Sequence, residues 1–337
     1  MAHSNISIFV PHAGCPYRCS FCDQNTISGE NELPHGEDVR RICRQAMAEI
    51  KNLKDTEIAF FGGSFTAIDR EYMTELLEAA HPFVGEGGFK GIRLSTRPDC
   101  INEEILRLLK SYGVTAIELG AQSLDDKVLA ANDRGHSAED VFNSSRLIRE
   151  WGFELGLQLM VGLYGSCEEI ELDNMSKVLD IRPDTVRIYP VVILKRTRLA
   201  GLLGSGKYRP MPFEKVVKLC SKMLCEFEQA GIRVIKCGLH ASEFVEQDMV
   251  GGYYHPAFRE LCESELYRES ISNALLAEGI PLYPGGNINV VCAVAKGCVS
   301  RAVGHKRSNA DYFRQHGVNI KFIADDAVQK YQCVIRR

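Results

Sequence analysis

The stretch Cys15-Pro-Tyr-Arg-Cys19-Ser-Phe-Cys22 places three cysteines close together, with the spacing Cys-x3-Cys-x2-Cys. It follows the apolar run Ile6-Ser-Ile-Phe-Val10, whose composition predicts a short strand. Thiolates are soft ligands that select zinc, copper(I) or an iron–sulfur cluster. A closed zinc or 4Fe–4S site usually takes four protein ligands, so three cysteines leave one coordination position open, as catalytic metal sites do.

Two other interpretations of this stretch stay open at this point. His12 precedes Cys15 with two residues between them, so it offers a fourth ligand for a structural zinc knuckle. A disulfide between two of the cysteines is the other possibility. The residues that follow decide between these interpretations and a catalytic cluster.

Strand and helix patterns alternate along the first 238 residues. After the first strand, apolar runs predict strands at 56–61, 91–96, 114–119, 153–163 and 185–190, with one more at 232–235. Repeated strand–helix units with short connections predict a parallel sheet covered by helices, and right-handed crossovers curl such units into a partial or full barrel. The expected fold class is α/β, a partial (β/α)6-type barrel with a small C-terminal α/β extension.

The pattern changes near residue 239, which predicts a barrel over 1–238 and an α/β extension over 239–337 that closes the substrate side. A glycine-rich turn at 251–256 precedes a helix at about 258–277. Strands are expected at 287–295 and 318–323, separated by a loop rich in basic residues.

Composition excludes several classes of protein. A chain of 337 residues with 45% hydrophobic and 25% charged residues is typical of a globular protein. Its net charge of −4 gives no global nucleic-acid footprint. Thirteen cysteines, no basic and apolar leader, and no apolar run of membrane-spanning length predict reduced thiols, a cytoplasmic location and no membrane partner.

The cysteine spacing, with Phe21 just before the last cysteine and a strand before the first, resembles the radical S-adenosylmethionine (SAM) enzymes. The resemblance implies that Cys15, Cys19 and Cys22 bind three irons of a 4Fe–4S cluster and that SAM chelates the fourth. One electron then cleaves SAM to methionine and a 5′-deoxyadenosyl radical, which abstracts a hydrogen atom from the substrate. The implied partners are a small-molecule substrate and an electron donor such as flavodoxin or ferredoxin.

The resemblance also implies a SAM-binding turn after the second strand. Gly62-Gly63-Ser64-Phe65 stands where the family has a Gly-Gly-Glu-like turn that binds the amino group of SAM. Glycine lets the backbone approach a ligand closely. Because Ser64 replaces the usual glutamate, we expect the backbone rather than the side chain of this turn to make the contact.

Further SAM contacts are implied at the ends of the third and fourth strands. Ser95, Arg97 and Gln122 resemble residues of the subgroup that contains the Elongator catalytic subunit and oxygen-independent coproporphyrinogen oxidase. The planar fork of Arg97 suits a carboxylate, and Arg134 lies in an arginine-containing loop of the same subgroup. The remaining candidates, which line the barrel or merely satisfy their neighbours, are Gln158 and Tyr189.

Substrate candidates come from the later strands and from the segment after the barrel. Arg187, on the sixth strand, is one candidate. If the substrate is a deazaguanine, its N–H edge would need a carboxylate facing it. Cys237 is a candidate hydrogen-atom donor to a substrate radical, with a plain buried cysteine as the alternative. The carboxylates available are Glu118, Asp184 and Glu243, and the residues expected at the substrate mouth are His240, Tyr254 and His255.

The segments 188–195 and 253–258 resemble a narrower group of short bacterial Elongator-like radical SAM proteins without an acetyltransferase domain. That resemblance implies a queuine lyase, a salvage activity for tRNA queuosine. Hydrogen abstraction from the cyclopentenediol ring would break the C–N link and release 7-aminomethyl-7-deazaguanine. Two alternatives remain: a tRNA-modifying radical SAM enzyme whose C-terminal basic loop grips RNA, which is possible but not favoured, and a non-enzymatic zinc-knuckle module.

Overall fold

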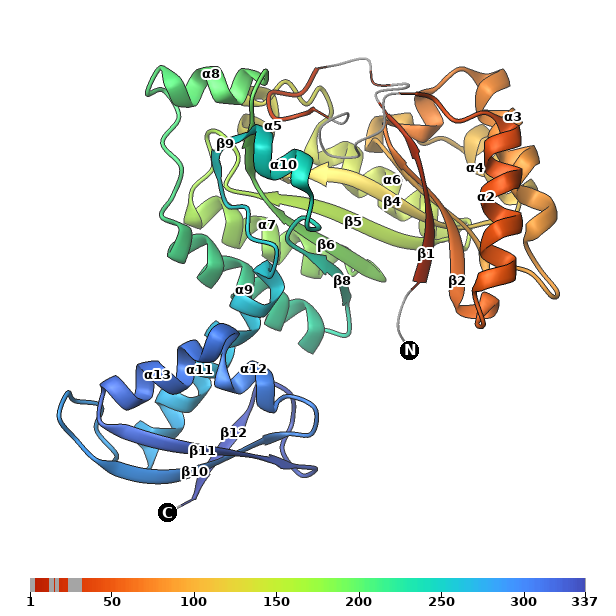
Figure 1. Cartoon of the computed structure of the whole chain (residues 1–337). Helices are drawn as coiled ribbons and strands as arrows, with labels where there is room; N and C mark the ends of the chain where they lie inside the picture. The colour runs from red at the N-terminus through yellow and green to blue at the C-terminus, as the bar shows by residue number, and fades with distance from the viewer. Residues whose placement is uncertain (1–3, 12–14, 16–17, 24–31, 337) are drawn as a thin grey trace.

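Seven parallel strands form the main sheet in a computed structural model that describes residues 4–11, 15, 18–23 and 32–336 (Figure 1). Every neighbouring pair is parallel, and the spatial order follows the chain. The strands are β1 (Ser4–Val10), β2 (Thr56–Gly62), β3 (Gly91–Thr96), β4 (Val114–Gln122), β5 (Glu154–Val161), β6 (Thr185–Pro190) and β8 (Arg233–Cys237). The α/β partial barrel is confirmed, with the expected strand near 232–235 as its seventh member.

Side chains alternate between the two faces of this sheet. On β3, Ile92 and Leu94 belong to the hydrophobic core, whereas Arg93 and Ser95 take part in polar contacts on the opposite face. β2 is buried on both faces over most of its length, as expected for a central parallel strand. The concave face therefore carries the polar side chains, and the convex face packs under helices.

Helices cover the convex face of the sheet. They are α2 (Gly36–Glu49), α3 (Arg70–Ala80), α4 (Glu103–Ser111), α6 (Ala138–Glu150), α7 (Glu168–Ile181) and α9 (Phe213–Gln229). Two short helices, α5 (Asp126–Ala131) and α8 (Arg198–Gly204), lie instead at the carboxyl end of the strands (Figure 1). Asn102 caps α4 by accepting from the backbone N–H of Ile105 at 2.9 Å, and Ser137 forms a capping box with Asp140 at the start of α6. These local signals position the helices that bury the sheet.

A short antiparallel pair lies at the end of β6, and one of its strands falls where the sequence predicts only a glycine-rich turn. β7 (Val192–Leu194) pairs with β9 (Met249–Gly252), and α10 (Glu243–Asp248) lies just before β9. The pairing continues into the next residue, because the N–H of Tyr253 donates to the carbonyl of Val191 at 2.8 Å. Residues near 250 are therefore held against the end of β6 instead of forming a free turn.

The C-terminal residues build a second hydrophobic core around a three-stranded sheet of order β11-β10-β12. Its elements are α11 (Phe258–Ala277), β10 (Ile288–Ala295), α12 (Val299–Val303), α13 (Ser308–Gln315), β11 (Val318–Asp325) and β12 (Cys333–Arg336). β12, antiparallel to β10, has no counterpart among the expected strands. Figure 1 shows this sheet at the opposite end of the molecule from the carboxyl end of β1, so only α10 and β9 of the extension lie near that end.

Two general expectations meet the structure here. All thirteen cysteines are free thiols, so the disulfide interpretation of the first cysteine stretch is not supported. None of the helices in the described ranges combines the length and apolar character that a bilayer crossing requires.

Candidate active site

The cysteine segment leaves the carboxyl end of β1 and is fixed by residues distant in sequence. The N–H of Ser20 donates to the carbonyl of Asn132 at 3.0 Å, and the Ser20 hydroxyl donates to the Asn132 side chain at 2.6 Å. The carbonyl of Ser20 accepts from the N–H of Leu199 at 2.8 Å, just inside α8. His12, the possible fourth zinc ligand, lies outside the described residues.

The three cysteines lie near one another in a largely buried setting. Burial, followed by the neighbouring thiols Cys19 and Cys15, raises the pKa of Cys22 to about 12. Burial also raises the pKa of Cys15, and the positive charge of Arg134 opposes that rise. Thiols with raised pKa values need a bound cation to become thiolate ligands.

The donor set fits a 4Fe–4S cluster. Besides burial, the nearby Cys19 sulfur raises the pKa of both Cys15 and Cys22, so the three thiols lie around one space. Three thiols can each bind a different iron and leave the fourth iron open to another ligand.

Arg134 connects the cysteines to the carboxyl end of β4. One of its terminal nitrogens donates to the Cys19 sulfur at 3.4 Å, and the other donates to the carbonyl of Gly120 at 2.6 Å. Its Nε is buried and has no hydrogen-bond partner within the described part of the chain. A buried guanidinium with an unused donor beside a cysteine suits an anionic cluster or a carboxylate of SAM.

The turn after β2 comes very close to β1. Gly62 has φ +116°, and a Cβ at this position would lie 2.8 Å from the carbonyl oxygen of Val10. The N–H of Gly63 donates to that same oxygen at 2.9 Å. Only glycine accepts this conformation and spacing, so Gly62 is required for the close approach of the turn to β1.

The side chains of Ser64 and Phe65, in the same turn, make contacts within the protein. The Ser64 hydroxyl is buried, lies 3.0 Å from the Thr96 hydroxyl and accepts from the N–H of Arg97 at 3.2 Å. Phe65 is buried and stacks on Phe60, with ring centroids 4.7 Å apart. Both side chains therefore have partners inside the protein, and the backbone contact between this turn and SAM stays a prediction.

Arg97 is predicted to bind the SAM carboxylate. In the structure its guanidinium binds the carboxylate of Asp99 instead. Its Nε and one terminal nitrogen bind the two oxygens of Asp99 at 2.9 and 2.7 Å. Its other terminal nitrogen donates to the carbonyl of Arg134 at 2.9 Å. Arg97 is 2% exposed, so it braces the Arg134 loop from inside the protein.

Gln122 keeps its predicted place at the carboxyl end of β4. Its φ of +64° lies in the left-handed region, which is uncommon for a residue other than glycine. The sheet register also shifts between Leu119 and Gln122. Such strain concentrates at functional sites, and this one lies beside Gly120, whose carbonyl binds Arg134.

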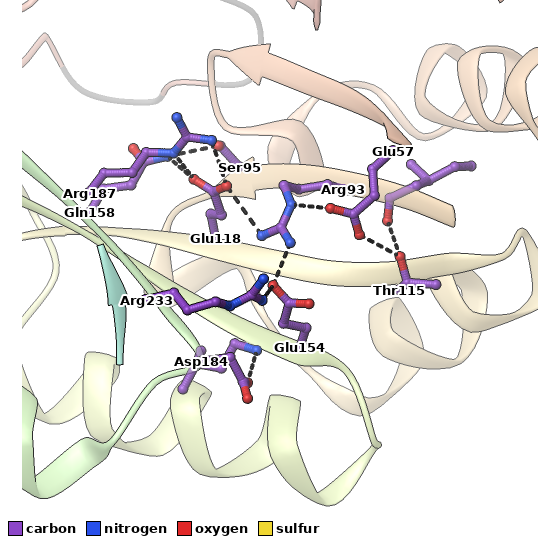
Figure 2. Close-up of polar contacts among 12 residues, drawn as sticks. Glu57, Arg93, Ser95, Thr115, Glu118, Glu154, Gln158, Asp184, Arg187 and Arg233 are labelled. Carbon is purple, nitrogen blue, oxygen red and sulfur yellow. Dashed lines mark hydrogen bonds and ion pairs between the residues drawn. The ribbon is translucent and has the colours of Figure 1, made fainter. Parts of the chain in front are cut away.

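The concave face of the barrel holds an interior ion network, defined here as Glu57, Arg93, Glu118, Glu154 and Arg187 (Figure 2). Arg93 is fully buried and binds Glu57 at 2.7 Å, Glu118 at 3.3 Å and Glu154 at 2.5 Å. Arg187 binds Glu118 through two nitrogens at 2.6 and 2.9 Å. Burial is the largest influence on Glu118 and opposes its ionisation, but Arg187 and Arg93 outweigh it, so its pKa lies below the usual range.

Three further predicted residues, Ser95, Gln158 and Tyr189, lie beside this network. The Gln158 amide donates to the Ser95 hydroxyl and to Glu118, both at 2.9 Å. Arg187 lies 4.9 Å from the centre of the Phe61 ring. Burial raises the pKa of Tyr189, and the adjacent Arg187 opposes that rise. Ser95, Gln158, Arg187 and Tyr189 thus form one polar wall of the interior.

Two predicted substrate carboxylates have structural partners instead. Glu118 is almost fully buried and engaged by Arg187, Arg93 and Gln158, so it is not open to a substrate. Asp184 precedes β6 and accepts from the N–H of Leu155 at 2.8 Å, at the amino end of the strands (Figure 2). Active sites of such barrels lie at the carboxyl end, so the prediction for Asp184 is wrong.

Cys237 lies on the convex side of the sheet. It is paired with Ile188 across the ladder, is buried, and its sulfur lies 4.0 Å from that of Cys262 on α11. The neighbouring Lys236 is the residue in register with Arg187. Strand alternation turns the Cys237 side chain away from the barrel interior. The structure therefore favours the alternative interpretation, in which Cys237 is a buried core cysteine.

The remaining substrate candidates lie outside the polar wall. Glu243 is exposed in the first turn of α10. The Tyr254 hydroxyl accepts from the N–H of Ser242 at 3.0 Å, and His255 accepts from the N–H of Ala257 at 3.0 Å. His240 is exposed and lines a groove beside β8. These residues surround the segment after the barrel.

Sequence reasoning missed the residues that hold the others in place. Arg93 and Glu154 carry no motif, and only their alternation with apolar neighbours could have suggested inward side chains. Gly156 carries a clearer signal, because a glycine inside a strand indicates close approach. A Cβ there would lie 2.7 Å from Cγ of Glu118, so Gly156 makes room for the buried carboxylate.

Comparison with known families matches this geometry. The profile of the Radical SAM superfamily matches residues 9–172, and that of the Radical_SAM C-terminal domain matches residues 183–268. This chain belongs to the radical SAM superfamily. Membership implies a 4Fe–4S cluster and SAM, and it favours the cluster over a zinc knuckle at the three cysteines.

Individual relatives are distant. The protein is 26% identical over 257 residues to a tRNA uridine(34) acetyltransferase of Methanocaldococcus infernus, covering 64% of this chain and 48% of that one. It is 24% identical over 223 residues to the heme chaperone HemW of Bacillus subtilis, covering 65% of this chain and 59% of the relative. It thus spans about half the length of the acetyltransferase.

One solved structure shares most of the fold. The archaeal Methanocaldococcus infernus Elp3 with an N-terminal deletion superposes with a TM-score of 0.60 at 19% identity. The superposition covers 83% of this chain and 64% of that one. At this identity the likeness establishes the fold alone.

The residues of this radical SAM protein divide into two groups around the space where the cofactors belong. When bound, the cluster and SAM supply a carbon-centred radical that removes a hydrogen atom from the substrate. Cys15, Cys19 and Cys22 would hold the cluster, with Arg134 from the loop after α5 and the Gly62 turn at the end of β2 beside it. The wall of Ser95, Gln158, Arg187 and Tyr189 offers hydrogen bonds within the same concave face.

Proposed function

We propose that this radical SAM enzyme modifies a base of tRNA. The observation that carries the proposal is its similarity to three tRNA uridine(34) acetyltransferases over 61–64% of its length. Because the chain spans about half of those relatives, the proposal covers the radical step alone. The electron for that step would come from a flavodoxin or a ferredoxin.

The interior polar wall supports a base as the substrate. Enzymes that act on a base must take it out of its stack and bind its edge in a pocket by hydrogen bonds. Arg187 is a planar donor fixed by Glu118, and the amide nitrogen of Gln158 is held by Ser95, so the wall presents a donor from Arg187 and an acceptor from Gln158 in set directions. Fixed polar groups of this kind orient a heterocycle for abstraction of one particular hydrogen.

Queuine lyase is the second candidate, and one contact favours keeping it. The two segments that resemble the short bacterial group, 188–195 and 253–258, lie side by side. β7 pairs with β9, and the N–H of Tyr253 donates to the carbonyl of Val191 at 2.8 Å. Two segments distant in sequence thus form one unit at the end of β6, as expected if they serve one substrate.

A single anaerobic assay separates the two candidates. The protein is reconstituted with iron and sulfide, given SAM and dithionite, and 5′-deoxyadenosine is quantified with bulk tRNA, with queuine and with neither. We expect tRNA to stimulate 5′-deoxyadenosine formation and a nucleoside of altered mass to appear in the digested tRNA. Cys19→Ala, which removes one cluster ligand, is the control and should form no 5′-deoxyadenosine.

The outcomes differ clearly. Stimulation by queuine, with 7-aminomethyl-7-deazaguanine as product, would replace the tRNA proposal with the lyase. Slow 5′-deoxyadenosine formation that neither compound stimulates would refute both substrates. Full activity of Cys19→Ala would contradict the assignment of the cluster.

A further inference from the structure

A groove of about 780 Å³ runs between strand β8 and the C-terminal unit. It is lined by Lys236 from β8, by Glu260 and Glu263 from α11, and by Arg301, His305 and Lys306 from the loop around α12. β8 is the last strand of the main sheet, so the groove follows an open edge of the barrel. The residues that line this groove include neither the three cluster cysteines nor the Gly62 turn.

Both carboxylates of the groove have partners within it. Glu263 forms ion pairs with Arg301 at 2.8 Å and with Arg259 at 3.2 Å. Glu260 lies 2.9 Å from a nitrogen of the His305 ring, a contact that is an ion pair only when this histidine is protonated. Lys236 and Lys306, in contrast, make no ion pair with a carboxylate of the described residues. The groove therefore has unmatched positive charge.

Lys236 joins the groove to the barrel interior. It is the residue in register with Arg187 on the neighbouring strand β6. Its half-buried ammonium thus lies beside the Arg187 guanidinium, whose carboxylate partner Glu118 also binds Arg93. Arg187 and Arg93 have carboxylate partners in the interior, whereas Lys236 makes no ion pair with a carboxylate of the described residues, so its charge is open to a ligand anion.

The loop that carries Lys306 is held in a strained shape. Lys306 has φ +50° and Arg307 has φ +66°, two consecutive left-handed residues that are not glycine. Asn309 fixes the loop by donating to the carbonyls of Ser264 at 2.7 Å and Ala302 at 3.1 Å, and the N–H of His305 donates to the Ser264 hydroxyl at 2.9 Å. Strain that is this firmly held indicates a functional loop.

We propose that this groove binds a phosphate group of the substrate, with Lys306 at its outer wall and Lys236 where it meets the interior. The inference rests on the proposed function and narrows it, because it requires a substrate with a phosphate rather than a free base. A phosphate here would place the attached nucleoside beside Arg187 and the polar wall. The phosphate comes either from an RNA strand or from a mononucleotide.

Binding measurements test this independently of turnover. The reconstituted protein is titrated into a fluorescently labelled RNA stem-loop, anisotropy is followed at about 50 and 200 mM salt, and uridine 5′-monophosphate serves as competitor. The variants are Lys236→Met, which keeps the apolar stem, and Lys306→Asn, because asparagine tolerates left-handed φ. Lys222→Gln, on the exposed face of α9 and outside the groove, removes the same charge as a control.

We expect each groove variant to weaken RNA binding about tenfold, the loss typical of one charge-assisted hydrogen bond. The slope of log affinity against log salt should fall by about 0.7–0.9 for each lost phosphate contact. Lys222→Gln should match the wild type. Competition by the mononucleotide would identify it as the phosphate source, and its failure to compete would assign the groove to an RNA strand.

The proposal is overturned if the wild type binds neither probe, or if the groove variants bind with unchanged affinity and slope. Circular dichroism melting of each variant shows whether a loss of binding reflects unfolding, and Lys306→Asn, in an exposed loop, provides the readout if Lys236→Met does not fold. Radical formation is scored separately as 5′-deoxyadenosine from the wild type. RNA binding through the groove without radical formation would refute the proposed function and leave the groove assignment standing.

Discussion

Replacing Glu118 with glutamine removes one negative charge from the centre of the interior ion network while keeping the shape of the side chain. The carboxylate accepts two bonds from Arg187, one from Arg93 and one from Gln158, and it is almost fully buried. Breaking a buried ion pair by removing one partner typically costs about 3–5 kcal/mol. Arg93 keeps Glu57 and Glu154, so we expect about 3 kcal/mol, the lower end of that range.

Thermal melting followed by circular dichroism measures this loss. A destabilisation of about 3 kcal/mol lowers the melting temperature by about 6–12 °C in a domain of this order of size. Glu37→Gln is the matched control, because Glu37 binds Arg40 at 3.0 Å on the exposed surface of α2, where removal of the charge should cause no measurable shift. The double variant Glu118→Leu/Arg187→Met should recover part of the loss, since it leaves no unpaired guanidinium. If Glu118→Gln and Glu37→Gln have the same melting temperature, the interior ion network does not stabilise the barrel.

The same carboxylate sets a pH dependence. Burial opposes its ionisation, but Arg187 and Arg93 hold its folded pKa below the ordinary value of 4.5. A lowered folded pKa contributes stability above the unfolded pKa, and that contribution is lost as the pH falls from about 4.5 through the folded value. The wild-type melting temperature should therefore drop over this acidic range, and Glu118→Gln should drop less. An equal acid sensitivity of the two proteins would contradict the assignment.

Three further changes probe the site and the helices around it. Gly62→Ala should weaken SAM binding and destabilise the fold by about 1–3 kcal/mol, because the new Cβ meets Val10 at positive φ; equilibrium dialysis with SAM and a melt would check both effects. Arg134→Gln should lower the reduction potential of the cluster by weakening the donor on Cys19, and an unchanged potential in a spectroscopic redox titration would exclude that contact in the loaded enzyme. Ser137→Ala should cost about 1 kcal/mol through the lost cap of α6, measured by urea unfolding, whereas Ser137→Asp should retain most of the stability.

Local sequence predicted most of the barrel because its signals act over a few residues. Apolar runs predict six of the seven barrel strands and indicate the seventh, and Asn102 and Ser137, residue types that favour N-caps, do cap their helices. Ser166, three residues before Glu169, has the same sequence signal, but Cys167 is the N-cap of α7, and the Ser166 hydroxyl donates to Glu171 at 2.6 Å. The Ser166 hydroxyl bonds to the Glu171 side chain instead of the helix backbone, and the local sequence pattern does not reveal this competing partner.

Predictions for single site residues were less successful where a side chain had a competing partner. Arg97 suits a carboxylate, but the nearest one is its own neighbour Asp99. Glu118 is a carboxylate at a barrel strand, but cations on β3 and β6 claim it. Cys237 lies at the end of a strand, and a one-residue register shift between Val186 and Arg187 gives the interior to Lys236 instead.

The sequence by itself determined the cysteine spacing, the strand–helix alternation, the glycine turn after β2 and the family. These are properties of short segments, set by backbone preferences and by the alternation of side chains along a strand. The tertiary structure alone decided that Arg134 donates to Cys19, that Arg93 joins carboxylates from β2, β4 and β5, and that Lys236 lies beside Arg187. Those pairings depend on the register between strands far apart in the chain, and the low polarity of the interior makes each buried charge find a partner there.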